Sequence, residues 1–242
     1  MNDVTNEFKG FTNNLIDELP KTLSKNYFSP VWDEVIGAGY KPERLLDFGC
    51  GNGVFGMYAK VATGCKLVGV DGSLYALEQA KEMGLDETHK IEDFCSSVLP
   101  LEDNSFDFVL CKDVFEHLLD PEFALREISR VLIKKGKFLF HVPNHFPLKS
   151  RLRFLFTNNI DTFGYFPNNE RWEYPHIRFF TEASLKKFFD KHGFTIEMKL
   201  SHHFGCLPFS RFFPPNSKTS VKLSKKSADQ FSEGYTLLLS KQ

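Results

Sequence analysis

Apolar and polar residues follow two alternating rhythms over residues 44–142. Short apolar runs, which are typical of buried strands, occupy residues 44–49, 66–71, 89–94, 106–111 and 136–142. Between these runs apolar residues recur at helical spacing, which predicts helices at residues 54–61, 74–83 and 121–132. Strands that alternate with helices at this interval predict an α/β fold with a doubly wound, mostly parallel sheet and helices on both faces.

The segment before this region predicts helices. Residues 3–28 carry apolar residues at helical spacing, and a second helix is expected from Ser29 onwards. Ser29 is expected to be its N-cap residue, because Pro30 suits the first helical position. We therefore expect an N-terminal helical extension over residues 1–40 and one α/β domain over residues 41–242.

The C-terminal part of the chain mixes regular and irregular segments. Residues 145–180 show no clear periodicity, and we expect them to form a lid or substrate insert, because long irregular segments in compact domains often carry binding loops. A helix is predicted within residues 181–194. Strands at 194–200 and 235–241 bring the expected sheet to seven strands. Residues 203–233 are expected to form a second irregular insert.

Composition excludes several classes of protein. The 242 residues carry a formal net charge of -1, whereas a general nucleic-acid binder would have a basic surplus. No apolar run approaches the ~20 residues that cross a bilayer, so we expect no membrane partner. The five cysteines are scattered and form no CxxC pair, so neither a disulfide framework nor a cysteine zinc site is expected. A cytoplasmic protein with reduced thiols is the simplest interpretation.

The glycine-rich stretch LLDFGCGNG at residues 45–53 carries the strongest chemical signal. Glycines at such a turn permit positive φ angles and a close backbone approach to a ligand, and the next helix offers free N–H groups. Asp71 ends the following strand, where a carboxylate typically holds ribose hydroxyls. The simpler alternative is a tight turn with a capping acid. Residues 49–54 differ from the GxGxxG pattern of nicotinamide-dependent dehydrogenases, because the last glycine is one position early.

Taken with three further motifs, this stretch resembles the class I S-adenosylmethionine-dependent methyltransferases of the small-molecule type. The other motifs are LVGVDGS (67–73), LPLEDNSFDFVLCKDVFEHLLDP (99–121) and LIKKGKFLFHVPN (132–144). The later stretch HIRFFTEASLKKFFDKHGF (176–194) resembles a segment common in small-molecule members. The resemblance implies a Rossmann-like fold and S-adenosyl-L-methionine as the cofactor.

The resemblance also implies which residues hold that cofactor. The first motif would cradle its methionine part, with Asp71 on the ribose. The family often has an acid shortly before the Leu-Pro that corresponds to Leu99, and here Asp93 lies slightly early, so the adenine contact falls to the stretch from Asp93 to Cys95. The complete set of expected cofactor residues is Asp47, Gly49, Cys50, Gly51, Asn52, Asp71, Gly72, Asp93, Phe94, Cys95, Lys112 and Asp113.

Three histidines are candidate catalytic residues. A base is needed only when the acceptor must lose a proton, and histidine suits that role near neutral pH. His117 follows the fourth strand, His145 follows the fifth, and His176 opens the His-x-Arg-Phe-Phe segment. His141 lies within a strand and is expected to be structural. Glu116 and Asp113 could form a cation site with His117, but no dedicated metal cluster is evident and no metal is expected.

Arginines among aromatic residues suggest an anionic acceptor, because arginine pairs bidentately with phosphate and carboxylate. The alternative is a solvated charged face over a Phe-rich core. The expected acceptor-binding residues are Arg151, Arg171, His176 and Arg178. We expect methyl transfer to a small polar molecule, with O-methylation favoured over N-methylation. The resemblance extends to enzymes that modify sugars and their phosphate or phosphoramidate substituents in surface polysaccharide biosynthesis. A cofactor-binding partner without transferase activity and a nicotinamide-dependent oxidoreductase are the alternatives.

Overall fold

The computed structural model describes residues 28–157, 176–200 and 226–242. The helical pattern before residue 28, the centre of the 145–180 segment and most of the 203–233 segment lie outside these described residues. Within them, no helix is both long and apolar enough to cross a membrane.

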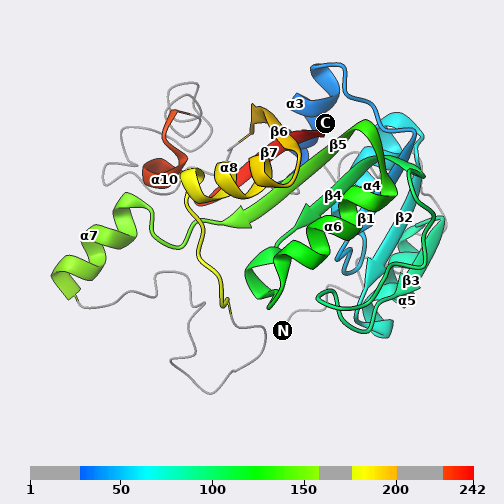
Figure 1. Cartoon of the computed structure of the whole chain (residues 1–242), viewed down its shortest axis with the longest axis horizontal. Coiled ribbons are helices and arrows are strands. Elements are labelled where there is room, and N and C mark those ends of the chain that lie inside the picture. Colours follow the sequence, from blue (N-terminus) through cyan, green and yellow to red (C-terminus); the bar gives the residue numbers. More distant parts are fainter. Residues whose placement is uncertain (1–27, 158–175, 201–225) are drawn as a thin grey trace. The chain divides into compact units, whose positions relative to one another are not determined.

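Strands and helices alternate along the described chain, and Figure 1 labels them. The strands are β1 (Arg44–Phe48), β2 (Lys66–Asp71), β3 (Glu87–Lys90), β4 (Phe106–Lys112), β5 (Leu132–Pro143), β6 (Phe194–Lys199) and β7 (Gly234–Lys241). The helices are α3 (Ser29–Gly37), α4 (Val54–Thr63), α5 (Leu74–Met83), the 3-10 helix η1 (Phe115–His117), α6 (Pro121–Val131), α7 (Leu148–Thr157), α8 (Glu182–Lys191) and α10 (Ala228–Phe231).

The seven strands form one sheet in the order β3-β2-β1-β4-β5-β7-β6. β1 pairs in parallel with β2 and with β4, and β6 pairs antiparallel with β7. The predicted α/β class and the mostly parallel, seven-stranded sheet are confirmed. The order reverses between β1 and β4, and ligands of doubly wound sheets bind beyond the carboxyl ends of strands at such a point.

The chain divides into two compact units. The first comprises Met1–Cys111 with Glu127–Lys137, and the second comprises Lys112–Arg126 with Phe138–Gln242. In the first unit the fully buried Trp32 ties α3 to the core, because its indole N–H donates to the carbonyl of Phe55 at 2.9 Å and its ring lies 5.5 Å from that of Phe108.

Aromatic packing dominates the core of the second unit. The buried rings of Phe115, Phe138, Phe140, Phe189 and Phe194 contact one another mainly edge to face, at centroid distances of 4.9–6.4 Å. Such contacts stabilise the fold by about 0.5–1.5 kcal/mol per pair, in addition to the free energy gained from burying apolar surface. Part of the high Phe content is therefore explained by this core.

The structure corrects several predicted boundaries. β3 lies at Glu87–Lys90, not at 89–94, because the chain turns after Ile91 donates to the carbonyl of Asp71 at 2.9 Å. Ser29 is the first residue of α3, and Phe28, not Ser29, holds the N-cap position. Residues 132–135 belong to a strand, so β5 begins earlier than predicted. The 145–180 segment, predicted to be irregular, contains the helix α7.

Candidate functional site

The glycine-rich turn follows β1 and leads directly into α4. Gly49, Gly51 and Gly53 have φ angles of 76°, 53° and 83°, which side chains other than glycine rarely adopt. The amides of Gly49 and Cys50 both donate to the carbonyl of Val70, at 2.8 and 3.0 Å, so the turn is fixed to the end of β2. A Cβ added at Gly51 would meet no atom within 4 Å, so the backbone there is open to a ligand.

Asp71 organises the same turn from the end of β2. Its Oδ2 accepts a hydrogen bond from the amide of Gly51, and its Oδ1 accepts one from the amide of Ser73, both at 2.8 Å. The carboxylate is half-buried and lies beside the open backbone of Gly51. Its placement fits a contact with cofactor hydroxyls, while its bonds also fit the simpler role of a capping acid. Gly72, next to Asp71, is exposed.

The other residues of the first motif differ in what they present to a ligand. Asp47 is only 3% exposed, and a methyl group at Gly56 would lie 2.8 Å from its Oδ2, so α4 needs a glycine here to approach the carboxylate. The Cys50 side chain is buried against Gly69, and burial raises the pKa of its thiol, with the charges of nearby acids adding to the effect. Cys50 thus offers a ligand its backbone. Asn52 accepts a hydrogen bond from the amide of Val54 at 3.4 Å.

The stretch expected to contact adenine forms a tight turn. The exposed Asp93 accepts hydrogen bonds from the Cys95 amide at 2.8 Å and the Ser96 hydroxyl at 2.7 Å, and these bonds lower its pKa. The Phe94 ring packs at 4.6 Å from the ring of Phe48, the last residue of β1. Phe94 therefore lies at the carboxyl end of β1. An apolar side chain at this position suits contact with a flat ring such as adenine.

A charged clamp that the sequence analysis did not identify holds the loop after this turn. Glu127 accepts from the Leu99 amide at 2.8 Å and pairs with Arg130 at 2.7 Å. Arg130 also donates to the carbonyls of Leu99 and Leu101 and pairs with Asp103. The sequence signal that could have identified this clamp is an acid and an arginine three residues apart on a predicted helix.

In the second unit, Lys112 is the last residue of β4, Asp113 follows it, and the two form an ion pair. Asp113 has a φ angle of 55°, and its amide donates to the carbonyl of His141 at 3.0 Å. His141 lies 3.4 Å from the Asp113 carboxylate through Nε2 and contacts the Thr236 hydroxyl at 2.7 Å through Nδ1. His141 therefore bridges two strand regions, as a structural histidine would, and the Lys112–Asp113 pair remains a proposed cofactor contact.

Glu116 occupies the centre of η1 and has an unusual environment. Its side chain is completely buried, and neither carboxylate oxygen has a hydrogen-bond partner among the described residues. Burial raises the pKa of Glu116 to about 8, with the Asp113 charge adding to the effect. The backbone carbonyl of Glu116, in contrast, accepts from the amides of Ile177 and Arg178 at 2.9 and 3.1 Å. These two bonds dock the His-x-Arg segment onto η1.

The structure brings the three candidate catalytic histidines together. The rings of His117 and His176 meet edge to face at 4.7 Å. Nδ1 of His176 lies 2.6 Å from Nε2 of His145, which is 2% exposed and packs against Phe179. Burial and the nearby His117 lower the pKa of His176 to about 4, so this imidazole is neutral at neutral pH.

Two of the arginines expected to bind the acceptor, Arg151 and Arg178, donate to backbone carbonyls. Arg178 donates through Nε to the carbonyl of Leu118 at 2.6 Å and through Nη2 to the carbonyl of Leu119. Arg151 donates to the carbonyls of Phe146 and Asp229. Arg171 lies outside the described residues. These contacts give Arg151 and Arg178 a role in holding loops.

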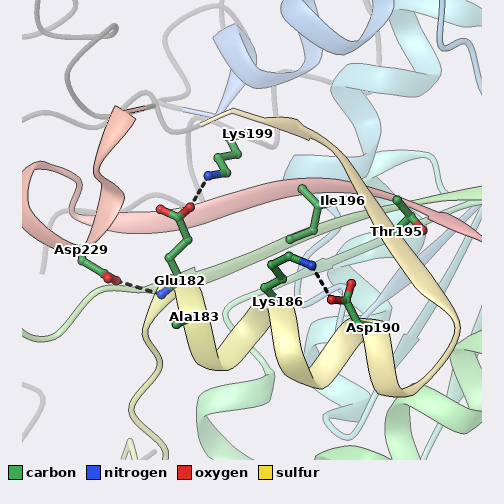
Figure 2. A pocket seen from close by; sticks show the side chains of 8 residues that line it. All are labelled: Glu182, Ala183, Lys186, Asp190, Thr195, Ile196, Lys199 and Asp229. Carbon is green, nitrogen blue, oxygen red and sulfur yellow. Dashed lines mark hydrogen bonds and ion pairs between the residues drawn. The ribbon is translucent and has the colours of Figure 1, made fainter.

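A groove in the second unit lies over α8 and β6 (Figure 2). Its charged side chains pair with one another: Lys199 with Glu182, and Lys186 with Asp190. Asp229 accepts from the amide of Glu182 at 2.8 Å. The charged side chains of the groove are thus paired with one another, whereas the buried carboxylate of Glu116 has no hydrogen-bond partner among the described residues.

Several known proteins similar to this chain are methyltransferases. Residues 46–140 match the family described as a methyltransferase domain. The chain is 36% identical over 103 residues to sarcosine/dimethylglycine N-methyltransferase of Halorhodospira halochloris, which covers 41% of this chain and 37% of that protein. It is 30% identical over 105 residues to ubiquinone biosynthesis O-methyltransferase of Idiomarina loihiensis, with 42% and 43% covered. The chain thus spans less than half the length of either curated relative.

Solved structures share the fold. An S-adenosylmethionine dependent methyltransferase from Mesorhizobium loti matches with a TM-score of 0.56 and 17% identity, covering 90% of this chain and 100% of that chain. The domain match favours the methyltransferase interpretation of the glycine turn over the dehydrogenase alternative. This chain thus carries a match to a methyltransferase domain over residues 46–140, and it has the fold of methyltransferases that depend on S-adenosylmethionine.

Proposed function

We propose that this protein transfers the methyl group of S-adenosylmethionine to a hydroxyl oxygen of a small, polar, anionic acceptor. Two groups of residues support the proposal. The glycine turn allows close approach of a ligand to the backbone at Gly51, and Asp71 places a carboxylate beside it. The observation that carries the choice of acceptor atom is the chain of contacts that joins His117, His176 and His145.

The residues of the first unit fit the cofactor. The backbone at Gly51 is open, and its φ angle of 53° disfavours most larger residues. The Asp71 carboxylate would accept hydrogen bonds from the ribose hydroxyls, and the ring of Phe94 would pack against adenine. When bound, S-adenosylmethionine supplies an activated methyl group that is attacked in line. Positioning in such reactions is worth ~7–11 kcal/mol, so a rigid turn matters more than a reactive side chain.

The histidines suit an acceptor that must lose a proton. A hydroxyl group is a weak nucleophile until its proton leaves, and a neutral imidazole within hydrogen-bond reach can receive that proton. The low pKa of His176 keeps its ring neutral, so it can accept a hydrogen bond from the acceptor hydroxyl but is a weak base alone, and the contact with His145 fixes the orientation of that ring. In this mechanism the histidine cluster binds the acceptor hydroxyl and takes up its proton as the methyl group is transferred.

The proposed acceptor class is a sugar or a phosphate or phosphoramidate substituent in surface polysaccharide biosynthesis. This rests on the resemblance of the segment that begins at His176 to small-molecule enzymes. The relatives act on different atoms, since one is named an N-methyltransferase and the other an O-methyltransferase. The need to remove a proton supports O-methylation for this chain.

The test is methyl transfer from labelled S-adenosylmethionine to a panel of sugar phosphates and to matched amino sugars. We expect transfer to hydroxyl-bearing anionic acceptors and a rate at least tenfold lower in His176→Gln, because a proton acceptor contributes about 10²–10⁴-fold. His192→Gln is the matched control, since His192 belongs to the same unit and lies 3.7 Å from Glu122, outside the cluster. Transfer only to amines would refute O-methylation. Cofactor binding without transfer to any acceptor would support a non-catalytic partner.

A further inference from the structure

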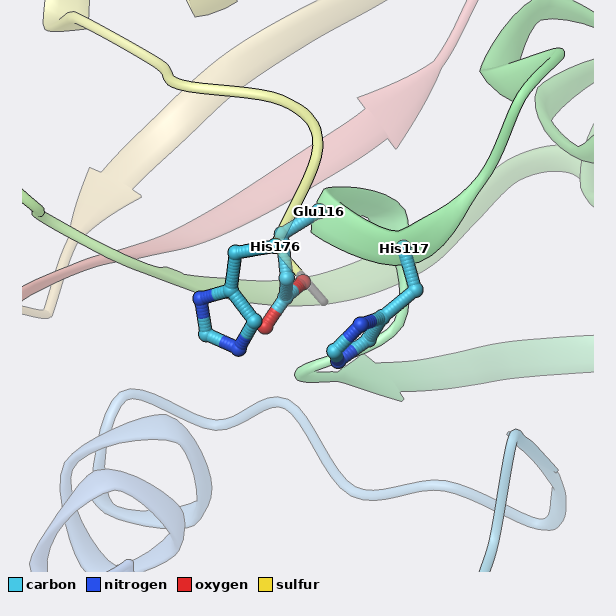
Figure 3. Close-up of side chains that lie close together, drawn as sticks. All are labelled: Glu116, His117 and His176. Carbon is cyan, nitrogen blue, oxygen red and sulfur yellow. The ribbon is translucent and has the colours of Figure 1, made fainter. Parts of the chain in front are cut away.

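We propose that Glu116, His117 and His176 form a binding site for one divalent first-row transition-metal ion. One ligand atom from each residue lies within 4.8 Å of the other two (Figure 3). The residues come from two segments, η1 and the stretch before α8. The sequence analysis expected no metal, because no dedicated metal cluster is evident in the sequence.

The protein backbone, not the ion, holds the two segments together. The amides of Ile177 and Arg178 donate to the carbonyl of Glu116, and Arg178 donates to the carbonyls after η1. The ligands are therefore presented by a fixed scaffold. Metal bonds of ~2.0–2.1 Å in tetrahedral geometry place ligand atoms roughly 3.3 Å apart. The present spacing of up to 4.8 Å is about 1.5 Å wider, so metal binding requires the ligand side chains to move closer together.

The buried carboxylate of Glu116 points to a cation independently of that spacing. Both of its oxygens are shielded from solvent and have no hydrogen-bond partner in the described part of the chain. A desolvated carboxylate is costly unless it is paired or coordinates a metal. Lys112, whose charge acts on Glu116, is engaged in an ion pair with Asp113. In Figure 3 the carboxylate is directed into the space between the two imidazole rings.

A supporting contact orients one of the histidine ligands. Nδ1 of His176 is occupied by His145 at 2.6 Å, so the opposite edge of the ring faces Glu116 and His117 (Figure 3). Metal-binding histidines almost always use their second nitrogen in this way, because the bond fixes the tautomer and the ring direction. His145 is thus a positioning residue in this site.

The donor set selects the kind of metal. Two imidazoles and one carboxylate suit Zn²⁺, Mn²⁺, Fe²⁺ or Co²⁺, whereas Mg²⁺ and Ca²⁺ prefer sites made of oxygen atoms. Three protein ligands leave at least one coordination position open, as in catalytic zinc sites.

A role for the ion in catalysis rests on the proposed function. The open position would take the acceptor hydroxyl, whose proton passes to water. The oxygen lone pair then forms the C–O bond as the C–S bond breaks, and the electron pair of that bond stays on sulfur. A divalent ion lowers the pKa of a bound hydroxyl group strongly, which would relieve the histidines of the role of base.

The experiment uses the full chain, stripped of metal with a chelator and titrated with Co²⁺ while visible absorption is recorded, without cofactor or acceptor. We expect one Co²⁺ per chain, displaced by Zn²⁺. We also expect Kd to rise about 100-fold or more in Glu116→Gln and His176→Gln, since even supporting residues cost 10–100-fold in affinity. Glu122→Gln and His192→Gln are matched controls, because they alter a Glu–His pair elsewhere in the same unit.

Circular dichroism and thermal melts verify that each variant is folded. A well-folded wild type that binds no Co²⁺ would overturn the site, as would folded ligand variants that bind Co²⁺ as tightly as the wild type. Calorimetry with demethylated cofactor tests the proposed function separately, so its failure is distinguishable. Full turnover of the metal-free protein would overturn the catalytic role of the ion.

Discussion

Replacing Asp71 with asparagine tests the centre of the proposed cofactor site. The change preserves size but removes the charge and replaces one acceptor oxygen with an NH₂ group. In the structure both oxygens accept from backbone amides, those of Gly51 and Ser73, at 2.8 Å. Asparagine can satisfy one of these amides and must present a donor to the other. The turn therefore loses a charge-assisted hydrogen bond, and the proposed ribose contact weakens.

The magnitude follows from the kind of bond that is lost. A hydrogen bond to a charged group contributes about 1.5–3 kcal/mol. At 1.36 kcal/mol per tenfold change, this corresponds to a roughly 10- to 150-fold increase in Kd. Isothermal titration with the demethylated cofactor measures this change directly. A thermal melt of the same sample measures what the turn itself loses in stability.

Asp86→Asn is the matched control for this experiment. Asp86 also caps a backbone amide in the first unit, accepting from Leu67 at 2.7 Å, and it pairs with Lys60 at 2.7 Å. We expect Asp86→Asn to lower the Tm while leaving cofactor affinity unchanged. If Asp71→Asn lowers the Tm as much as the control and leaves Kd unchanged, Asp71 is only a capping acid and the assignment of the cofactor site is wrong.

Three further predictions concern stability. Gly53→Ala should destabilise the fold by about 1–3 kcal/mol in urea unfolding, because φ is 83° and the new Cβ would lie 2.4 Å from a Leu85 methyl group; Gly37→Ala, with open space and no positive φ, should not destabilise. Although burial opposes ionisation, hydrogen bonds from Arg130 and the Leu99 amide lower the pKa of Glu127 in the folded protein. Ionised Glu127 therefore stabilises the fold above the unfolded pKa of about 4.3, and this stabilisation is lost as pH falls through the folded pKa. Glu127→Gln should therefore cost about 1–3 kcal/mol at pH 7 and flatten the acid side of the stability profile; an unchanged profile would contradict this. Arg178→Lys should lower the Tm through lost bonds to the loop carbonyls, and a raised acceptor KM with an unchanged Tm would restore the role in acceptor binding.

The sheet and its main helices were predictable because their signals are local. A buried parallel strand is a continuous apolar run, and the helices of the first unit show apolar residues on one face. The helix α7 gave no such signal. Phe154, Leu155 and Phe156 are consecutive and all exposed, so its apolar residues do not form the single buried face that periodicity detects.

The two parts of the candidate site also differ in whether their sequence signal is local. The glycine turn is one continuous motif, and the end of the next strand supplies Asp71, so neighbouring parallel strands bring them together. The histidine cluster instead depends on two amide hydrogen bonds from Ile177 and Arg178 to a single carbonyl of η1. Backbone hydrogen bonds between distant loops leave no pattern in side-chain chemistry. The sequence therefore indicated each histidine separately but not their grouping.

Glu116 shows where this difference matters most for chemistry. From the sequence, a glutamate beside a histidine is an ordinary polar pair, and its expected surroundings are solvent. The structure buries it completely, because η1 is covered by the segment that its own carbonyl binds. The burial that leaves both carboxylate oxygens without a hydrogen-bond partner also places His176 against them. One docking contact thus produces both the cost of ionising the buried carboxyl group and the ligands that would offset that cost with a cation.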